Sequence, residues 1–316
     1  MKGIGVAVPP VIIVAGPTAS GKSALALVLA EAFGGTVINA DSMQVYRDLF
    51  LLTARPDAAA LARAPHRLYG FLEAGEEICS VARWLVLAHA AVQEAHGAGR
   101  LPIVVGGTGL YLEALRHGLA LVPEVPAAVR AKTRDLMAVI GPHAFHARLA
   151  ERDPVMAARL RPSDPQRLQR AWEVLMASGR SLADWQGAAV MEGMRARFCS
   201  LMLMPPRPVL RAACDTRLRC MVAAGAVAEV AALLARAVPS DRPILKALGV
   251  SALADHIRGR CSLEEAVMAA QGATRRYAKR QCTWFRHHLT DARVIADASM
   301  PDEALALVGS FLQAPP

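Results

Sequence analysis

The chain has 316 residues, which is long for one hydrophobic core and predicts one large domain with an insertion or a small second domain. Hydrophobic residues make up 54% of the chain, but no apolar run reaches the roughly 18–20 residues of a membrane span, so we expect no membrane association. Lysine and arginine number 36 against 27 acidic residues, and this net charge of +9 is compatible with a nucleic-acid partner.

The cysteines and histidines do not form a recognisable framework. The six cysteines include no C-x-x-C pair, which favours free thiols in a reducing cytoplasm. The pairs His143/His146 and His287/His288 have no nearby cysteine or acidic partner at metal spacing, so we expect no transition-metal site. The apolar stretch 6–15 could be taken for a signal peptide. It contains two prolines and runs directly into the next motif, so we interpret it as the first strand.

The segment Gly16–Ser23 reads GPTASGKS and fits the phosphate-loop pattern G-x-x-x-x-G-K-[ST]. The apolar run Val11–Ala15 precedes it and the helix-compatible run Ala24–Phe33 follows it, so backbone N–H groups and a helix N-terminus would surround a phosphate. Lys22 would reach the terminal phosphate, and the Ser23 hydroxyl would bind its Mg²⁺. The residues predicted to form this cradle are Gly16, Pro17, Thr18, Ala19, Ser20, Gly21, Lys22 and Ser23. The motif alone specifies neither the phosphate compound nor the reaction.

Short apolar runs alternate with helical segments in the next part of the chain. A second strand over Thr36–Ala40 leads into Asp41, residues 56–100 are predicted to be helical, and a third strand covers Leu101–Val105. This alternation favours a parallel α/β sheet, in which the carboxyl ends of the strands, and therefore Asp41 and the phosphate loop, converge on one crevice. The glycines in Gly106–Gly109 would allow a ligand close to the backbone, although a plain strand-to-helix turn would explain them as well.

The composition changes at about residue 118. From there to about residue 197 the chain is charged and rich in proline, with helical periodicity and no convincing strand. We therefore predict a helical insertion domain over 118–197 within a core formed by 1–117 and 198–316. Inside the insertion, Ser163-Asp164-Pro165 is a typical helix start, and Gly179 would end that helix.

The core resumes with a strand over Phe198–Met204. The helix after it carries Asp215, Arg217 and Arg219, and an arginine there could be a surface charge or could reach the phosphates as a bidentate clamp. A basic helix over Ala273–His287 could be a solvated face or could bind a nucleic-acid backbone. A last strand and a closing helix are predicted over Val294–Ala296 and Pro301–Leu312. The fold class is thus α/β, a P-loop NTPase-like parallel sheet flanked by helices, with a helical insertion domain.

Five segments in this order resemble one known family. They are Gly16–Ser23, Asn39–Tyr46 (NADSMQVY), Leu101–Tyr111 (LPIVVGGTGLY), Asp164–Arg170 (DPQRLQR) and Ala273–Arg286 (ATRRYAKRQCTWFR). Together they resemble the tRNA dimethylallyltransferases, also called isopentenyl transferases. The resemblance implies that the phosphate loop holds the diphosphate of dimethylallyl diphosphate rather than a nucleoside triphosphate. It also implies that the prenyl group moves to the exocyclic N6 of adenine 37, beside the anticodon of tRNA.

The resemblance implies roles for individual residues. Lys22, Arg217 and Ser23 with Mg²⁺ would stabilise the departing diphosphate, and Asp41 would orient N6 and take its proton, with Thr108 lining the base end of the channel. Adenine 37 would leave the anticodon-loop stack to enter the crevice. The residues assigned to tRNA are Asp41, Ser42, Met43, Gln44, Thr108, Arg130, Gln166, Arg167, Leu168, Gln169, Arg170, Lys246 and Gly249. The resemblance further implies a cytoplasmic monomer that acts on the anticodon stem-loop.

The chain also departs from the family pattern. Where the family reads YRGLDIGTAKP, residues 46–56 read YRDLFLLTARP, and further departures lie at 67–70 and 250–251. None of them touches the phosphate loop, Asp41 or Arg217, so the chemistry is expected to survive while RNA affinity changes. Two alternatives stay open from the sequence: a P-loop small-molecule or nucleoside kinase, and an RNA-binding homologue without catalytic activity.

Overall fold

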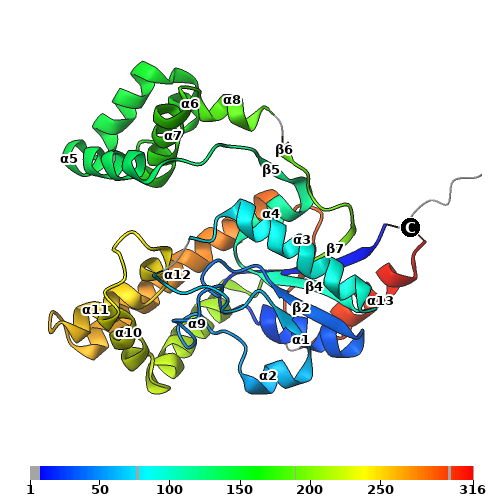
Figure 1. Cartoon of the computed structure of the whole chain (residues 1–316). Coiled ribbons are helices and arrows are strands. Elements are labelled where there is room, and N and C mark those ends of the chain that lie inside the picture. Colours follow the sequence, from blue (N-terminus) through cyan, green and yellow to red (C-terminus); the bar gives the residue numbers. More distant parts are fainter. Residues whose placement is uncertain (1–7, 76–77, 189, 298–299, 316) are drawn as a thin grey trace, which may run out of the picture. The chain divides into compact units, whose positions relative to one another are not determined.

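The structure, a computed structural model, describes residues 8–75, 78–188, 190–297 and 300–315 (Figure 1). The chain divides into two compact units, a core unit of Met1–Arg116 with Met194–Pro316 and an insertion unit of His117–Gly193. The sequence-based division placed the junctions after residues 117 and 197. Residues 6 and 7, the start of the stretch weighed as a signal peptide, lie outside the described residues.

The core unit is built on a six-stranded parallel sheet with strand order β3-β2-β4-β1-β7-β8, so the predicted parallel α/β fold is confirmed. The strands are β1 (Pro10–Ala15), β2 (Gly35–Asn39), β3 (His66–Arg67), β4 (Leu101–Gly106), β7 (Arg197–Leu203) and β8 (Arg293–Ile295). β1 pairs with both β4 and β7, with Ala15 opposite Gly106 and Met202. The loops after β1 and β4 therefore leave the sheet side by side at the same edge.

Helices cover both faces of the sheet, which explains why β1 is a continuous apolar run. α1 (Lys22–Ala32) and α13 (Asp302–Gln313) cover one face, and α3 (Val81–Gly97) and α4 (Gly109–His117) cover the other (Figure 1). Trp84 of α3 is fully buried and stacks on Tyr111 of α4, with the ring centroids 4.3 Å apart. Burial of these large side chains fixes the helices on the sheet and thereby the loops at its edge.

The prediction of helix throughout 56–100 was wrong. Only α2 (Ala58–Arg63) and α3 are helical there, and the short strand β3 lies between them. β3 pairs with β2, and the positive φ angles of Leu68 (65°) and Gly70 (56°) turn the chain after it. A two-residue strand gives no alternation that sequence periodicity could detect.

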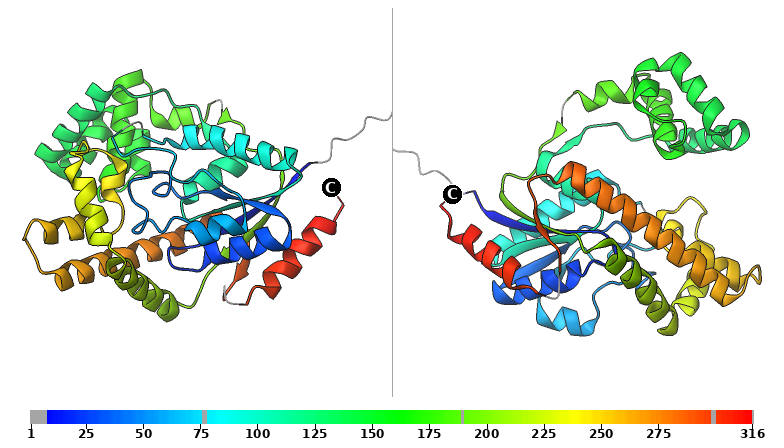
Figure 2. Two further views of the ribbon diagram at one scale, coloured as in Figure 1. Left: turned by 60° about the horizontal axis from the view of Figure 1, so that its bottom comes forward. Right: turned by 180° about the vertical axis from the view of Figure 1, so that it is seen from behind.

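The remaining helices of the core unit pack with residues 45–52 into a hydrophobic cluster separate from the one around the sheet, hereafter the second hydrophobic cluster. They are α9 (Arg207–Ala223), α10 (Ala226–Ala235), the 3-10 helix η1 (Pro243–Lys246), α11 (Val250–Ile257) and α12 (Leu263–His288). α12 starts ten residues before the predicted basic helix, at a capping box in which Ser262 and Glu265 each accept the other's backbone N–H. Figure 2 shows α12 lying beside α9 in both views.

Residues 50–52, which lie in the segment that departs from the family pattern, are bonded to α10. The Glu229 carboxylate accepts hydrogen bonds from three consecutive backbone N–H groups, those of Phe50, Leu51 and Leu52. The last two bonds measure 2.8 and 3.0 Å. The carboxylate thus ties this loop to the helical cluster and satisfies donors that would otherwise need other partners.

The insertion unit is mainly helical and has a core of its own. It contains α5 (Ala127–Arg152), α6 (Pro154–Arg159), α7 (Pro165–Ser178), α8 (Leu182–Gln186) and an antiparallel pair of two-residue strands, β5 (Leu119–Ala120) and β6 (Val190–Met191). The expectation of no strand here was therefore wrong. α7 begins at Asp164, whose side chain caps it, and ends at Gly179 in a left-handed conformation, as predicted. Phe145 and Trp172 meet edge to face in the centre of the core.

All six cysteines are free. In the described part of the chain, no single helix has the length and apolar character to cross a membrane; by those two criteria alone, the α9–α10 pair, bent by 68°, would qualify.

Candidate active site

The loop between β1 and α1 has the backbone of an anion cradle. Ala19 and Gly21 adopt left-handed conformations, with φ angles of 62° and 87°, and Gly21 is the N-cap of α1. A Cβ atom on Gly16 would lie 2.9 Å from the Leu203 carbonyl oxygen of β7, so only glycine fits there. The unpaired N–H groups at the start of α1 and its helix dipole favour a bound anion.

Lys22 places its ammonium group in this loop. Its Nζ donates to the Pro17 carbonyl oxygen at 3.3 Å. The pKa of Lys22 is lowered to about 8, mainly by burial; the Asp41 carboxylate opposes this change and the Arg217 guanidinium adds to it. An anion bound in the loop would restore the favourable environment of the charged form. Ser23, the next residue, is exposed at the first turn of α1.

Asp41 follows β2 and is held by a buried amide. The Asn39 side chain accepts from the Asp41 backbone N–H at 2.8 Å and donates to the carbonyl oxygens of Asp41 and Leu68, both at 3.0 Å. The indole N–H of Trp84 donates to the Asn39 carbonyl oxygen. Asn39 was not among the predicted site residues; its only signal in the sequence is an amide at the end of a strand, two residues before the carboxylate, and the structure shows that it is fully buried.

The turn after Asp41 is joined to the loop after β4. The Thr108 Oγ1 accepts from the Ser42 backbone N–H at 2.9 Å and donates to the Ser42 hydroxyl at 3.3 Å. A Cβ atom on Gly106 would lie 2.1 Å from the Ala40 carbonyl oxygen. The glycine therefore permits two strand ends to approach each other, which a plain turn would not require.

Arg217 of α9 belongs to the same electrostatic cluster. Burial lowers its pKa, while the nearby Asp41 carboxylate and Cys214 thiol oppose that change. Asp41 also adds to the effect of burial on Tyr277 of α12, whose pKa is raised to about 12. One carboxylate thus lies within electrostatic reach of Lys22, Arg217 and an aromatic hydroxyl on α12. The predicted residues Lys22, Asp41, Thr108 and Arg217 are brought together by four separate elements.

Two other residues of the DSMQ run support the backbone. Both amide hydrogens of Gln44 are donated to main-chain oxygens, those of Thr53 at 2.8 Å and Ala54 at 3.0 Å. The Met43 N–H donates to the Asp41 carboxylate at 2.9 Å, and the Met43 side chain packs on the second hydrophobic cluster. The amide of Gln44 is therefore committed to the following loop and is not available as a hydrogen-bond donor to a base.

The predicted RNA residues at 246–249 lie away from this cluster in the sequence and differ in exposure. Lys246 is exposed at the end of η1. Gly249 is buried as the N-cap of α11 with a φ angle of 93°, and a Cβ there would lie 3.2 Å from the Leu52 side chain. The positive φ angle and the close packing against Leu52 explain why residue 249 is a glycine. Val250, a departure from the family pattern, is buried in the second hydrophobic cluster together with Leu52.

In the insertion unit, Arg130 of α5 and Arg170 of α7 come together around Glu173. Burial raises the pKa of Glu173, and the guanidinium groups of Arg170, Arg130 and Arg134 oppose that change. Gln166 and Arg167 are exposed and Gln169 is partly exposed. Leu168, which was assigned to tRNA, is fully buried in the core of the unit, so its side chain packs and offers no surface to a ligand.

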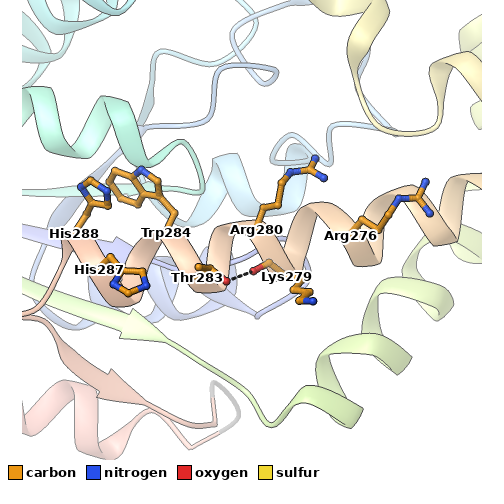
Figure 3. Close-up of a pocket in the computed structure, with 7 residues that line it drawn as sticks. All are labelled: Arg276, Lys279, Arg280, Thr283, Trp284, His287 and His288. Atoms are coloured by element: carbon orange, nitrogen blue, oxygen red, sulfur yellow. Dashed lines mark hydrogen bonds between the residues drawn. The ribbon is translucent and has the colours of Figure 1, made fainter. Parts of the chain in front are cut away.

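The basic helix α12 borders an open surface pocket of about 520 Å³ (Figure 3). The pocket is lined by Arg276, Lys279, Arg280, Thr283, Trp284, His287 and His288. Trp284 stacks on His288 with ring centroids 4.3 Å apart. Arg275, by contrast, is paired with Asp215 at 2.5 Å and is only partly exposed, so it adds less free positive charge to this face. Among the described residues, no group of three His, Cys, Asp or Glu side chains could hold a metal ion.

Comparisons with known proteins agree on one family. The profile of the IPP transferase family matches residues 44–288, and that of isopentenyl transferase matches residues 9–72. The chain is 55% identical to the tRNA dimethylallyltransferase of Rhodospirillum rubrum, over 96% of this chain and 94% of the relative. It is 51% identical to that of Paramagnetospirillum magneticum, over 95% and 94%.

Two solved structures are also similar. The full-length tRNA isopentenylpyrophosphate transferase of Bacillus halodurans is 31% identical, with a TM-score of 0.67 over 96% of this chain and 95% of that chain. A eukaryotic dimethylallyltransferase acting on tRNA is 26% identical, with a TM-score of 0.78 over 98% of this chain and 80% of that chain.

Proposed function

The chain belongs to the IPP transferase family, and from that premise we propose that it transfers a dimethylallyl group from dimethylallyl diphosphate to N6 of adenine 37 in the tRNA anticodon loop. The observation that carries the proposal is the joining of the phosphate loop, Asp41, Thr108 and Arg217 in one electrostatic cluster at the edge of the sheet. An anion cradle beside a carboxylate suits a reaction in which a diphosphate leaves and a weakly nucleophilic amine attacks.

The leaving-group end of the site would favour the transition state over the bound donor. The bond between the allylic carbon and the diphosphate oxygen breaks, and the diphosphate leaves with the electron pair. Negative charge on the diphosphate therefore grows as the bond stretches. Lys22, Arg217 and the loop N–H groups would stabilise this charge with little reorganisation, which their shared electrostatic environment and burial support.

The acceptor end would make adenine N6 competent to attack. The N6 lone pair is delocalised into the purine ring, so the amine is a poor nucleophile. Asp41 would accept a hydrogen bond from N6–H and take that proton while the new carbon–nitrogen bond forms. Asn39 and Thr108 hold the backbone on either side of Asp41, which keeps the carboxylate directed by rigid strand ends.

The residues present fit a magnesium ion bound mainly by its substrate. Mg²⁺ prefers oxygen ligands, keeps several waters and usually takes few protein ligands beside phosphate oxygens. The exposed Ser23 hydroxyl at the first turn of α1 supplies one such oxygen. We propose that Ser23 holds the ion, which when bound would neutralise charge on the diphosphate.

The RNA partner would be the anticodon stem-loop, with adenine 37 extruded from its stack. Arg130, Arg170 and the exposed start of α7 in the insertion unit supply positive charge for the backbone, as does the outer face of α12 in the core unit. The free cysteines and the tRNA substrate support a cytoplasmic location, and we take the working unit to be a monomer.

The decisive experiment supplies unmodified tRNA together with either labelled dimethylallyl diphosphate or ATP labelled on its γ-phosphate. The expected result is label in tRNA from the prenyl donor and no transfer from ATP. Transfer of the γ-phosphate would replace the proposal with a kinase. Tight RNA binding with neither transfer would leave an RNA-binding homologue without activity.

The lowered pKa of Lys22 predicts that donor binding weakens in alkali. With a pKa of about 8 in the free protein, Lys22 is mostly charged at pH 7 and loses its charge as the pH rises through 8. Only the charged form attracts the diphosphate, whose own titration is complete below that pH. The Kd for dimethylallyl diphosphate, measured by calorimetry, should therefore rise toward a limit of about tenfold per pH unit between pH 8 and 9.5.

The variant Lys22→Arg is the matched control, because arginine stays charged over this range. Its Kd should change little between pH 7 and 9.5, even where its affinity at pH 7 is lower. An equal rise of Kd in both proteins would assign the pH dependence to some other group.

The pocket face of α12 gives a prediction about salt. Replacing Arg276, Lys279 and Arg280 with alanine should weaken tRNA binding and reduce the slope of log K against log salt by about 2, because three phosphate contacts are lost. Filter binding or anisotropy at several salt concentrations measures the slope. The control variant removes three equal charges already paired with carboxylates, Arg47, Arg63 and Arg67. An unchanged slope in the first variant would show that the α12 face is merely solvated.

A further inference from the structure

Gln281 of α12 connects the two loops of the site. Its Oε1 accepts from the Thr18 backbone N–H of the phosphate loop at 2.8 Å, and its Nε2 donates to the Gly107 carbonyl oxygen at 2.8 Å. The side chain is 6% exposed. Thr18 lies in the loop after β1 and Gly107 in the loop after β4, so one carboxamide spans the loops of two paired strands.

The fit requires an amide at 281 and a glycine at 107. A carboxamide is the side chain that offers a donor and an acceptor on one planar group at this reach. A Cβ on Gly107 would lie 2.4 Å from Nε2, so any other residue would push the amide away. The contact with Gln281 therefore explains why residue 107 is glycine, just as the close approach to Ala40 explains the glycine at 106.

Gln281 is also linked to the Asp41 carboxylate, through the backbone and one further hydrogen bond. Gly107 is followed by Thr108, whose Oγ1 accepts from the Ser42 backbone N–H, and Ser42 follows Asp41. At the other end, the Thr18 N–H is occupied by Gln281 and the Ser20 N–H donates to the Pro17 carbonyl oxygen, which leaves the N–H groups of Ala19, Gly21 and the first turn of α1 to hold a phosphate. Gln281 thus lies midway in a chain of bonds from the diphosphate cradle to the acceptor carboxylate.

We propose that Gln281 is a positioning residue that sets the separation between the diphosphate cradle and the Asp41 carboxylate. The inference rests on the proposed prenyl transfer. In-line displacement needs the allylic carbon held between a departing diphosphate and an attacking N6, and a misplacement of about 1 Å can cost on the order of 100-fold in rate. The bridging amide fixes that spacing from outside the substrate, through the backbone of both loops.

The test compares Gln281→Met with Gln271→Met. Methionine keeps the length of glutamine and removes both hydrogen bonds. Gln271 is the matched control because it is 7% exposed on the same helix and donates to a carbonyl oxygen, that of Asp215, at 3.1 Å. We expect Gln281→Met to lower kcat by roughly 10- to 100-fold with a smaller change in donor KM. Gln271→Met should keep kcat within a factor of about three.

Hydrogen exchange supplies a readout that does not depend on activity. The Thr18 amide, followed by NMR, should exchange at least about tenfold faster in Gln281→Met and unchanged in Gln271→Met, because only the first loses its acceptor. If the wild-type protein transfers no prenyl group, the proposed function fails, while the exchange result still decides whether Gln281 restrains the loop.

Gln281→Glu keeps the test falsifiable if the methionine variant does not fold. The carboxylate can still accept from Thr18 but repels the Gly107 carbonyl oxygen, so slow exchange at Thr18 should persist while kcat falls. Wild-type kcat in either folded variant would overturn the positioning role. Equal losses of kcat in Gln281→Met and Gln271→Met would also overturn it, since general destabilisation of α12 would then suffice.

Discussion

Replacing Asp41 with asparagine should lower kcat for prenyl transfer by roughly 10²- to 10⁴-fold, the usual contribution of a general base. Asparagine is isosteric and can still accept from the Met43 N–H, so the turn is expected to survive. Removal of the carboxylate lifts its repulsion of the diphosphate but also lowers the pKa of Lys22, and because these effects oppose each other the Kd for dimethylallyl diphosphate should stay nearly unchanged. Steady-state kinetics and calorimetry at pH 7 measure the two quantities separately.

Asp57→Asn is the control for this substitution. Asp57 is exposed and caps α2 by accepting from the Ala60 N–H at 2.8 Å, the same kind of local bond that Asp41 makes with Met43. Its replacement should leave kcat unchanged. If kcat of Asp41→Asn stays within threefold of wild type, Asp41 is not the base and another group must take the N6 proton.

Replacing Arg217 with glutamine should lower kcat/KM for the prenyl donor by roughly 10²- to 10³-fold. Arg217 shares the electrostatic environment of Lys22 and Asp41, and its charge would meet the diphosphate as negative charge develops. Because that interaction strengthens in the transition state, the loss should fall on kcat as well as on KM. Single-turnover rates with saturating donor would show the kcat component directly.

Arg219, two residues further along α9, provides the comparison. It is more than half exposed and pairs with Glu264 at 2.6 Å. Arg219→Gln removes the same charge from the same helix, and the kinetics should not change. Equal losses in both variants would point to the net charge of α9 rather than to a contact with the diphosphate.

The parts of the site that sequence could locate are those encoded by local pattern. The strand, loop and first helical turn at 10–23 follow from one apolar run and one motif, and the structure has them where the pattern indicates. Asp41 was located beside the phosphate loop because residues that end parallel strands meet at one edge of a sheet. The family resemblance supplied Thr108, the choice of Arg217 and the roles.

The parts that sequence could not locate depend on partners far away in the chain. Gln281 bonds to a residue 263 positions earlier, and no spacing rule connects the two. Gln44 was predicted to line the base end of the channel, but both of its amide hydrogens are donated to carbonyl oxygens nine and ten residues later. Leu168 was assigned to tRNA together with its neighbours in 166–170, but it lies on the buried side of α7 and is a core residue.

The Glu229 carboxylate joins residues 50–52 to α10 across most of the chain. Its three partners are backbone N–H groups, which every residue except proline carries, so the contact depends on the path of the loop and on the acid at 229 rather than on the loop side chains. A chimaera in which α10 lacks this acid would leave the three amides without their acceptor. Such a chimaera should loosen residues 50–52 even though the whole insertion unit lies between the two segments in the sequence.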